Sequence, residues 1–179
     1  MTVTSAPELH TSHWFNTDAP ITLASLRGRV VVIEAFQMLC PGCVAHGLPQ
    51  AMRIAAAFSS ADVCVLGLHT VFEHHAAQGT VAALAAFLHE YRISFPVAID
   101  APAVTGALPQ TMSAYEMRGT PTLLLIDRAG QLRRQYFGAE PDLVIGAEIM
   151  ALVCEQPSPG QVEPDRSPAG RDRVTRTAK

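Results

Sequence analysis

The chain has 179 residues, of which 49% are apolar and 16% are charged, and its formal net charge is −3. A chain of this length buries enough surface to form one globular domain with its own core. Because the net charge is small and negative, we expect neither nucleic acid nor a membrane surface among its partners.

The first 20 residues contain no Lys or Arg and no continuous apolar run, so they do not resemble a secretory signal. No later segment approaches the roughly 20 apolar residues that a helix needs to cross a bilayer. We therefore expect a cytoplasmic protein whose thiols are kept reduced. Residues 1–13 are predicted to be a flexible N-terminus, and the domain is predicted to span residues 14–154.

The pattern of apolar residues predicts strands that alternate with helices. Residues 28–36 form an almost continuous β-branched run, which is typical of a strand buried on both faces. Residues 80–91 are amphipathic with Thr80 as a suitable N-cap, and Pro49 is expected to kink an earlier helix near Gly47. The predicted elements are a short strand region near Trp14 and Ile21, strands at 28–36, 61–69 and 95–100, two strands within 120–138 joined by a turn at 127–130, and helices at 44–60, 80–91, 108–115 and 141–154.

This order of elements predicts an α/β fold in which a mixed sheet carries helices on both faces. Residues 155–179 differ from the rest of the chain, because they are rich in Pro and contain no aromatic residue. Such a composition cannot bury enough apolar surface to offset the entropy of ordering, so this segment is predicted to be a disordered tail.

Two cysteines, Cys40 and Cys43, lie just after the first long strand and at the start of a predicted helix. Thiol-disulfide exchange needs one reactive exposed thiol and a second thiol within reach, and this spacing supplies both. At the helix N-terminus, Cys40 is favoured as a thiolate by free backbone N–H groups, and Cys43 is expected to be more buried. The residue pattern therefore favours a redox centre.

Two other interpretations of the cysteine pair stay open, which are a structural metal site and plain packing of small apolar side chains. A zinc site normally needs a second pair of ligands, and the chain has no second pair of this spacing. The candidate further ligands are Cys64, His69, His74 and His75. We expect no metal and no cofactor, and we expect Cys64 and Cys154 to be buried as small hydrophobes.

Glu34 lies inside the apolar strand, six residues before Cys40. If the carboxyl group is buried, desolvation raises its pKa, and Glu34 then serves as the general base that takes the Cys43 proton. The alternative is an ordinary glutamate, exposed near the strand end or paired with a cation such as Arg53.

Four segments, "VVVIEAFQMLCPGC", "VCVLGLH", "FPVAID" and "RGTPTLLLIDRAGQLRRQYFG", occur in an order that resembles the thioredoxin superfamily. The resemblance covers roughly residues 14–153 and is strongest to TlpA-like and redoxin-type thiol-disulfide oxidoreductases. It implies a thioredoxin-like fold and exchange with protein or small-molecule disulfides, with a cellular thiol reductant resetting the pair. An antioxidant role belongs to the same expectation.

Carried over by position, Cys40 resembles the nucleophile of that family, Cys43 the resolving cysteine and Glu34 the buried acid. Thr120 and Pro121 resemble the loop whose cis-proline faces the disulfide and whose backbone pairs with substrate. Both residues are therefore predicted to bind substrate.

The sequence departs from the family around the cysteines. Leu39 stands where the family often has Trp, and Pro41-Gly42 replaces Gly-Pro or Pro-Pro, so these three residues are expected to affect partner choice and reduction potential. Pro49 lies six residues after Cys43, where five is usual, which predicts a bulge in the helix or a different helix start.

The histidines near residue 70 are interpreted separately. By the resemblance, His69 follows a strand near the site and is expected to tune the Cys40 thiolate or to contact substrate. His74 and His75 are expected to be loop residues in solvent.

Two competing functions remain at this stage. One is a thiol peroxidase of the redoxin or peroxiredoxin type, although Ile33 and Gln37 occupy positions where peroxiredoxins typically have Pro and Thr or Ser. The other is a non-enzymatic thioredoxin-like module that senses redox state or binds a partner.

Overall fold

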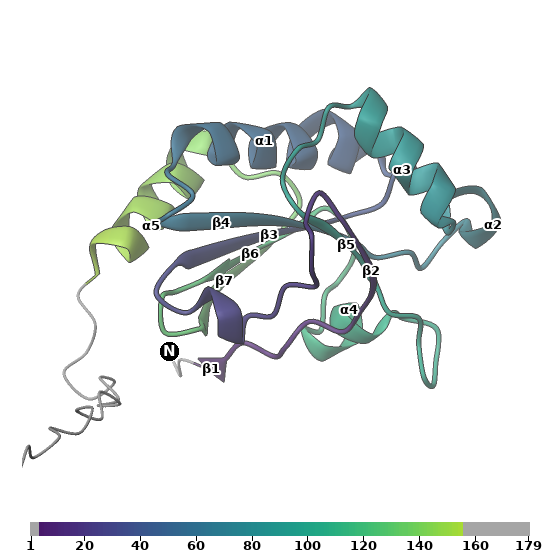
Figure 1. Cartoon of the computed structure of the whole chain (residues 1–179), viewed down its shortest axis with the longest axis horizontal. Coiled ribbons are helices and arrows are strands. Elements are labelled where there is room, and N and C mark those ends of the chain that lie inside the picture. The colour runs from purple at the N-terminus through teal and green to yellow at the C-terminus, as the bar shows by residue number, and fades with distance from the viewer. Residues whose placement is uncertain (1–3, 156–179) are drawn as a thin grey trace, which may run out of the picture.

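The computed structural model describes residues 4–155, which form a seven-stranded mixed sheet with the strand order β1-β7-β6-β3-β4-β5-β2. Figure 1 shows the sheet edge-on between two layers of helices. The strands are β1 (Thr4–Ser5), β2 (Thr11–Phe15), β3 (Val30–Phe36), β4 (Val63–His69), β5 (Val97–Asp100), β6 (Thr122–Ile126) and β7 (Gln131–Phe137). The helical segments are a 3-10 turn (Ala24–Leu26), a π-helical turn (Cys43–Gly47), α1 (Leu48–Ala57), α2 (His75–Gln78), α3 (Val81–Glu90), α4 (Gln110–Ala114) and α5 (Asp142–Cys154).

Strand β3 is the centre of the sheet, and all seven of its residues are buried. It pairs in parallel with β4, where Val30 lies opposite Val63, and antiparallel with β6, where Ile33 lies opposite Leu124. Its β-branched residues suit a strand that is covered on both faces. The prediction of a buried central strand at 28–36 is confirmed, with Val30 as the first paired residue.

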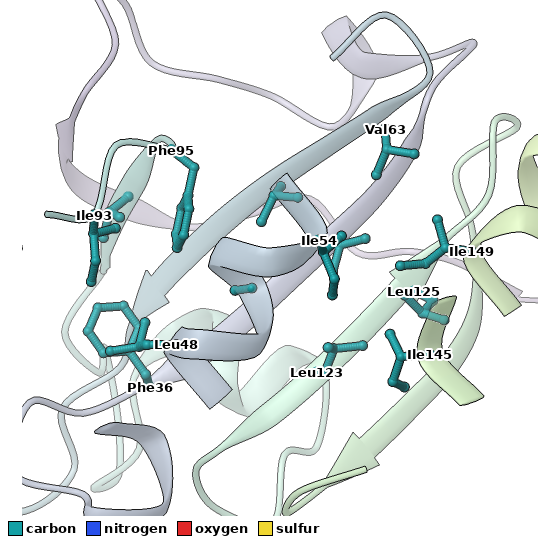
Figure 2. Packing of buried hydrophobic residues seen from close by; sticks show 14 of the residues in the cluster. Phe36, Leu48, Ile54, Val63, Ile93, Phe95, Leu123, Leu125, Ile145 and Ile149 are labelled. Atoms are coloured by element: carbon teal, nitrogen blue, oxygen red, sulfur yellow. The ribbon is translucent and has the colours of Figure 1, made fainter. Parts of the chain in front are cut away.

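Helices cover both faces of the sheet, as predicted, and each face has its own apolar core. Helices α1, α3 and α5 lie over one face and α4 over the other (Figure 1). Figure 2 shows the first core, where Leu48 of α1 lies beside Phe36 of β3. Ile54 of α1 points to the other side, toward Ile149 of α5. The second core gathers alternate strand residues such as Leu124. Because successive side chains of a strand point to opposite faces of the sheet, the strands contribute residues to both cores. This packing on both faces holds β3 in place beneath α1.

The N-terminal segment differs from the prediction of a flexible chain over residues 1–13. Residues 4–5 pair with β7 at one edge of the sheet, and residues 11–15 pair with β5 at the other edge. The connecting residues are also anchored, because Tyr115 Oη donates a 2.6 Å hydrogen bond to the carbonyl of Pro7 and Leu23 N donates to Glu8 Oε1 at 2.7 Å. The predicted strand region near Trp14 is confirmed as β2, but Ile21 lies outside any strand, and the two-residue strand β1 is too short to give a pattern in the sequence.

The hairpin that joins β6 to β7 is confirmed. Asp127 Oδ1 accepts hydrogen bonds from the backbone N–H groups of Ala129 and Gln131, both at 2.9 Å. Gly130 has a φ of 77°, a conformation that costs glycine little. The N-cap of α3 is confirmed as well, since Thr80 accepts a hydrogen bond from Ala83 N at 3.1 Å.

Three further outcomes concern helix α2, the C-terminal tail and the question of membrane-spanning helices. Short helix α2 was not predicted, and it lies in the histidine-rich segment. Of the predicted tail 155–179, all but Glu155 lies outside the described residues. Within residues 4–155, no helix combines the length and the apolar character needed to cross a membrane.

Candidate functional site

The two cysteines lie where β3 ends and the first long helix begins, and they differ sharply in exposure. Cys40 is partly exposed, whereas Cys43 is 0% exposed, and both are free thiols. The backbone N–H of Cys43 donates to Cys40 Sγ at 3.3 Å, and the Cys40 thiol donates to the carbonyl of Thr120 at 3.5 Å. The structure therefore brings together one accessible sulfur, one buried sulfur and the loop before Pro121.

Burial controls the protonation of Cys43. Desolvation, together with a hydrogen bond involving Cys40, raises the pKa of the Cys43 thiol to about 12. A thiol with so high a pKa is protonated at neutral pH, and the thiolate is the form that attacks a disulfide. Cys43 consequently needs a proton acceptor before it can react.

Glu34 is the acidic group at the bottom of the site. Its side chain is 1% exposed, and within residues 4–155 its Oε1 atom has no hydrogen-bond partner. Burial, and to a smaller extent negative charge on Cys40, raises the pKa of Glu34 well above its usual value. The predicted buried acid with a raised pKa is thus what the structure contains. Arg53, the alternative partner, pairs with Asp142 at 2.6 Å instead.

A π-helical turn over Cys43–Gly47 makes room for the Glu34 carboxyl group. Any Cβ atom at position 47 would overlap Glu34 Oε1 and come within 3.0 Å of the Pro121 side chain, so only glycine fits there. A π-turn adds one residue to a helix, and such turns often occur at functional sites. The extra residue explains why Pro49 lies six positions after Cys43, and it is the bulge that this spacing predicts.

The loop before β6 closes the site from the other side. The Thr120–Pro121 peptide bond is cis. A Cβ atom on Gly42 would lie 3.2 Å from Pro121 Cδ, so the proline ring packs directly against the segment between the two cysteines. Gly138 N holds this loop by donating to the Pro121 carbonyl at 2.9 Å.

The remaining residues of the reactive loop face outward. Leu39 is 55% exposed, Pro41 is exposed and Gly42 is partly exposed. A large apolar side chain that is this exposed beside a reactive thiol is available to contact a bound molecule. The three positions that depart from the family pattern therefore all lie around Cys40.

A buried pair of amides, Gln37 and Gln78, supports the reactive loop and was missed in the sequence. Gln78 Nε2 donates to Gln37 Oε1 at 3.0 Å, and Gln78 Oε1 accepts from the backbone N–H of Leu39 at 3.1 Å. Gln37 Oε1 also accepts from Phe72 N and Glu73 N, both at 3.3 Å. These bonds fasten the reactive loop to the segment that leads into α2. The only sequence signal was a glutamine next to an apolar strand.

His69 does not lie where its predicted role requires. The last residue of β4, it is 1% exposed, its ring lies 5.3 Å from that of Phe36, and burial lowers its pKa to about 4. A side chain this deep in the sheet cannot contact substrate, so that prediction is corrected.

The two further histidines and two further cysteines considered in the sequence are all at least partly exposed. His74 and His75 are exposed, as expected. Cys64 is only partly buried and Cys154 is exposed, so the expectation that both are buried is corrected. Within the described part of the chain, His, Cys, Asp and Glu side chains form no group of three or more that could hold a metal ion.

Comparison with known proteins agrees with this geometry. Residues 4–148 match the Redoxin family. The chain belongs to the Redoxin family. A solved thioredoxin-like superfamily protein is 60% identical, with a TM-score of 0.83 over 86% of this chain and 98% of that one. A solved thiol-disulfide isomerase from Corynebacterium glutamicum is 44% identical, with a TM-score of 0.80 over 84% of this chain and 98% of that one.

The chain is also 31% identical over 167 residues, or 91% of its length, to protein DipZ of Mycobacterium tuberculosis. It spans 22% of that protein's length, so this redoxin-type chain corresponds to a part of a much longer relative. The predicted thioredoxin-like fold, and the resemblance to thioredoxin-like thiol-disulfide oxidoreductases, are confirmed.

Proposed function

We propose that this chain catalyses thiol-disulfide exchange, with Cys40 as the nucleophile and Cys43 as the resolving cysteine. The observation that carries the proposal is the asymmetry of the pair, since Cys40 is accessible and Cys43 is fully buried. A substrate sulfur reaches only the first thiol, and the second acts only within the molecule. The 44% identical protein from Corynebacterium glutamicum is named a thiol-disulfide isomerase, which supports the same chemistry here.

In the reducing direction, the Cys40 thiolate attacks one sulfur of a substrate disulfide and forms a mixed disulfide, and the other substrate sulfur leaves as a thiolate. Cys43, once deprotonated, attacks Cys40 Sγ and releases the second substrate sulfur. The Cys40–Cys43 pair is thereby oxidised by two electrons, the substrate is reduced to a dithiol, and two protons pass to the substrate thiolates. The oxidising direction is the reverse of these steps.

Glu34 is proposed as the general base for the second step. The pKa of the Cys43 thiol is about 12, which leaves very little thiolate at neutral pH. A carboxylate whose pKa is raised by burial accepts a proton more readily than an ordinary glutamate does. The Oε1 atom lies against Gly47, one turn after Cys43, and has no partner in the described residues that would compete for the proton.

Substrate binding is proposed to involve Thr120, Pro121, Leu39, Pro41 and Gly42. The Thr120 backbone next to Cys40 offers hydrogen bonds to an extended segment, and the exposed Leu39 offers an apolar contact. We propose protein or small-molecule disulfides as substrates and a cellular thiol as the reductant, with a cytoplasmic location and an antioxidant role as the accompanying expectations.

Reduction of insulin disulfides by the purified chain, with dithiothreitol as the final reductant, tests this function. We expect Cys40→Ser to lower the rate to background, on the order of a thousandfold or more, because the attacking sulfur is lost. Cys43→Ser should instead accumulate a mixed disulfide that mass spectrometry detects. Cys154→Ser is the matched control, since this exposed cysteine lies at the end of α5. If Cys40→Ser retains the wild-type rate, the mechanism is wrong.

A further inference from the structure

An exposed aromatic ring and an arginine lie together at the loop whose Thr120 carbonyl contacts Cys40. Phe137, the last residue of β7, is 47% exposed, and the guanidinium carbon of Arg118 lies 5.2 Å from the centre of its ring. Arg118 is itself exposed, in the segment that precedes Thr120 and Pro121. We call these two residues the Arg118–Phe137 pair.

The Arg118–Phe137 pair is held close to Cys40 by the backbone of the same loop. The Phe137 ring packs against Gly119, where a Cβ atom would come within 2.9 Å of the ring. The next residue, Thr120, provides the carbonyl that accepts from the Cys40 thiol at 3.5 Å. The backbone under the ring and the backbone that contacts the Cys40 sulfur therefore belong to adjacent residues, so we expect a segment bound at Cys40 to pass the Arg118–Phe137 pair.

The charge of Arg118 is not neutralised by a neighbouring carboxylate. Among residues 4–155, four other arginines pair with carboxylates, whereas Arg118 pairs with none and instead stacks on an aromatic ring. Those four arginines are Arg53, Arg128, Arg133 and Arg134. Stacking on a ring leaves the N–H groups at the edge of the guanidinium free, and they suit a carboxylate in a two-pronged arrangement.

Resting on the proposed exchange function, we propose that the Arg118–Phe137 pair selects disulfide substrates that carry an acidic residue next to the reacting cysteine. The substrate carboxylate pairs with the free edge of the Arg118 guanidinium, while the Phe137 ring keeps that guanidinium in place. Leu39, which is 55% exposed, adds an apolar contact on the reactive loop itself. The substrate class is therefore an extended, acidic polypeptide segment.

The test compares two peptides that contain one disulfide each and differ only in a Glu or a Lys next to the cysteine. We expect the wild-type chain to show roughly tenfold higher kcat/KM for the Glu peptide, as a partly exposed charge-assisted contact allows. The preference should shrink with added salt, because the contact is near solvent. Arg118→Gln should abolish the preference, and Arg118→Glu should reverse it.

Arg92→Glu is the matched control, because Arg92 is an exposed arginine between α3 and β5. This substitution changes the net charge by the same amount as Arg118→Glu. It should keep the wild-type ratio between the two peptides. Equal turnover of both peptides by the wild type, or an unchanged ratio in Arg118→Glu, would overturn the proposed selection while the exchange function stands. Absence of any Cys40-dependent turnover of peptides and insulin would overturn both proposals.

Discussion

Glu34 and Asp100 are both carboxylates buried in the same sheet, yet their surroundings are opposite. Asp100, at the end of β5, accepts hydrogen bonds from the backbone N–H groups of Thr111 and Met112 at 2.8 and 2.9 Å. Glu34, in the centre of β3, has an Oε1 atom without any partner in the described residues. Burial raises the pKa of both groups, but at Asp100 the backbone hydrogen bonds act against that rise.

The difference separates a structural acid, Asp100, from the proposed general base, Glu34. The Asp100 carboxylate is stabilised by N–H groups at the start of α4 and so fixes that helix to the sheet. The Glu34 carboxyl group lacks such donors, and its environment therefore favours the protonated form. A carboxylate whose charge is disfavoured accepts a proton readily, as the proposed general base for the Cys43 step must.

Neutralising Glu34 should give the largest effect. We expect Glu34→Gln to slow the Cys43 step by on the order of a hundredfold, because the proton acceptor is lost. The measurement is a single-turnover assay that follows decay of the mixed disulfide. Asp100→Asn removes the other buried carboxylate and should leave this rate within a few-fold of the wild type; equal slowing in both variants would refute the assignment of Glu34 as base.

Glu34→Gln should also change how the free energy of unfolding depends on pH. Since the pKa of Glu34 is higher in the folded protein than in the unfolded chain, the folded state binds more protons above about pH 4.5, the ordinary value for Glu. The free energy of unfolding contributed by this group therefore falls as pH rises through that value toward the raised pKa. Urea titrations between pH 4 and 8 under reducing conditions should show this decline in the wild type and not in Glu34→Gln.

Gly47→Ala tests how closely the carboxyl group is confined. We expect a loss of about 3 kcal/mol in the free energy of unfolding, because the new methyl group overlaps Glu34 Oε1 and crowds Pro121. In a Glu34→Ala background the same change should cost clearly less, since the overlapping atoms are gone. The measurement is urea denaturation. If Gly47→Ala lowers the free energy of unfolding equally in the two backgrounds, the π-turn is not needed to accommodate the Glu34 carboxyl group.

Asp100→Asn should have the smallest of these effects. The amide keeps one oxygen and loses the charge, so we expect the free energy of unfolding to fall by about 2 kcal/mol. Exchange activity below the unfolding transition should stay close to that of the wild type. Gln110→Ala, next to Thr111 on α4, serves as a control for changes in that helix that leave the carboxylate bonds intact.

Sequence patterns predicted those parts of the molecule whose cause is local. A β-branched run indicated the buried strand β3, two cysteines three apart indicated the close Cys40–Cys43 pair, and the position of Pro49 indicated the bulge in the helix. Each of these signals lies within a few neighbouring residues. The resemblance to a known family then related these signals to one another.

The parts that were missed depend on residues far apart in the chain. Gln37 and Gln78 meet across 41 positions, and nothing near either glutamine indicates the other. His69 was correctly placed at the end of the strand predicted at 61–69, but pairing of β4 with both β3 and β5 buries its side chain, which the local pattern does not show. Strand β1 was not predicted, because its two residues are stabilised by pairing with β7 rather than by their own composition, whereas β2 was predicted as the strand region near Trp14.

The two outermost strands of the sheet come from the same dozen residues. Strand β1 covers part of β7, and β2, which begins six residues after β1 ends, covers β5, so one short segment passes across the molecule and closes both edges (Figure 1). Uncovered edge strands recruit strands from other molecules and promote aggregation. A shortened chain that begins at residue 16 would keep Glu34, both cysteines and the Thr120–Pro121 loop. It would, however, leave the outer edges of β7 and β5 unpaired. The N-terminal segment thus protects the solubility of a domain whose chemistry it does not touch.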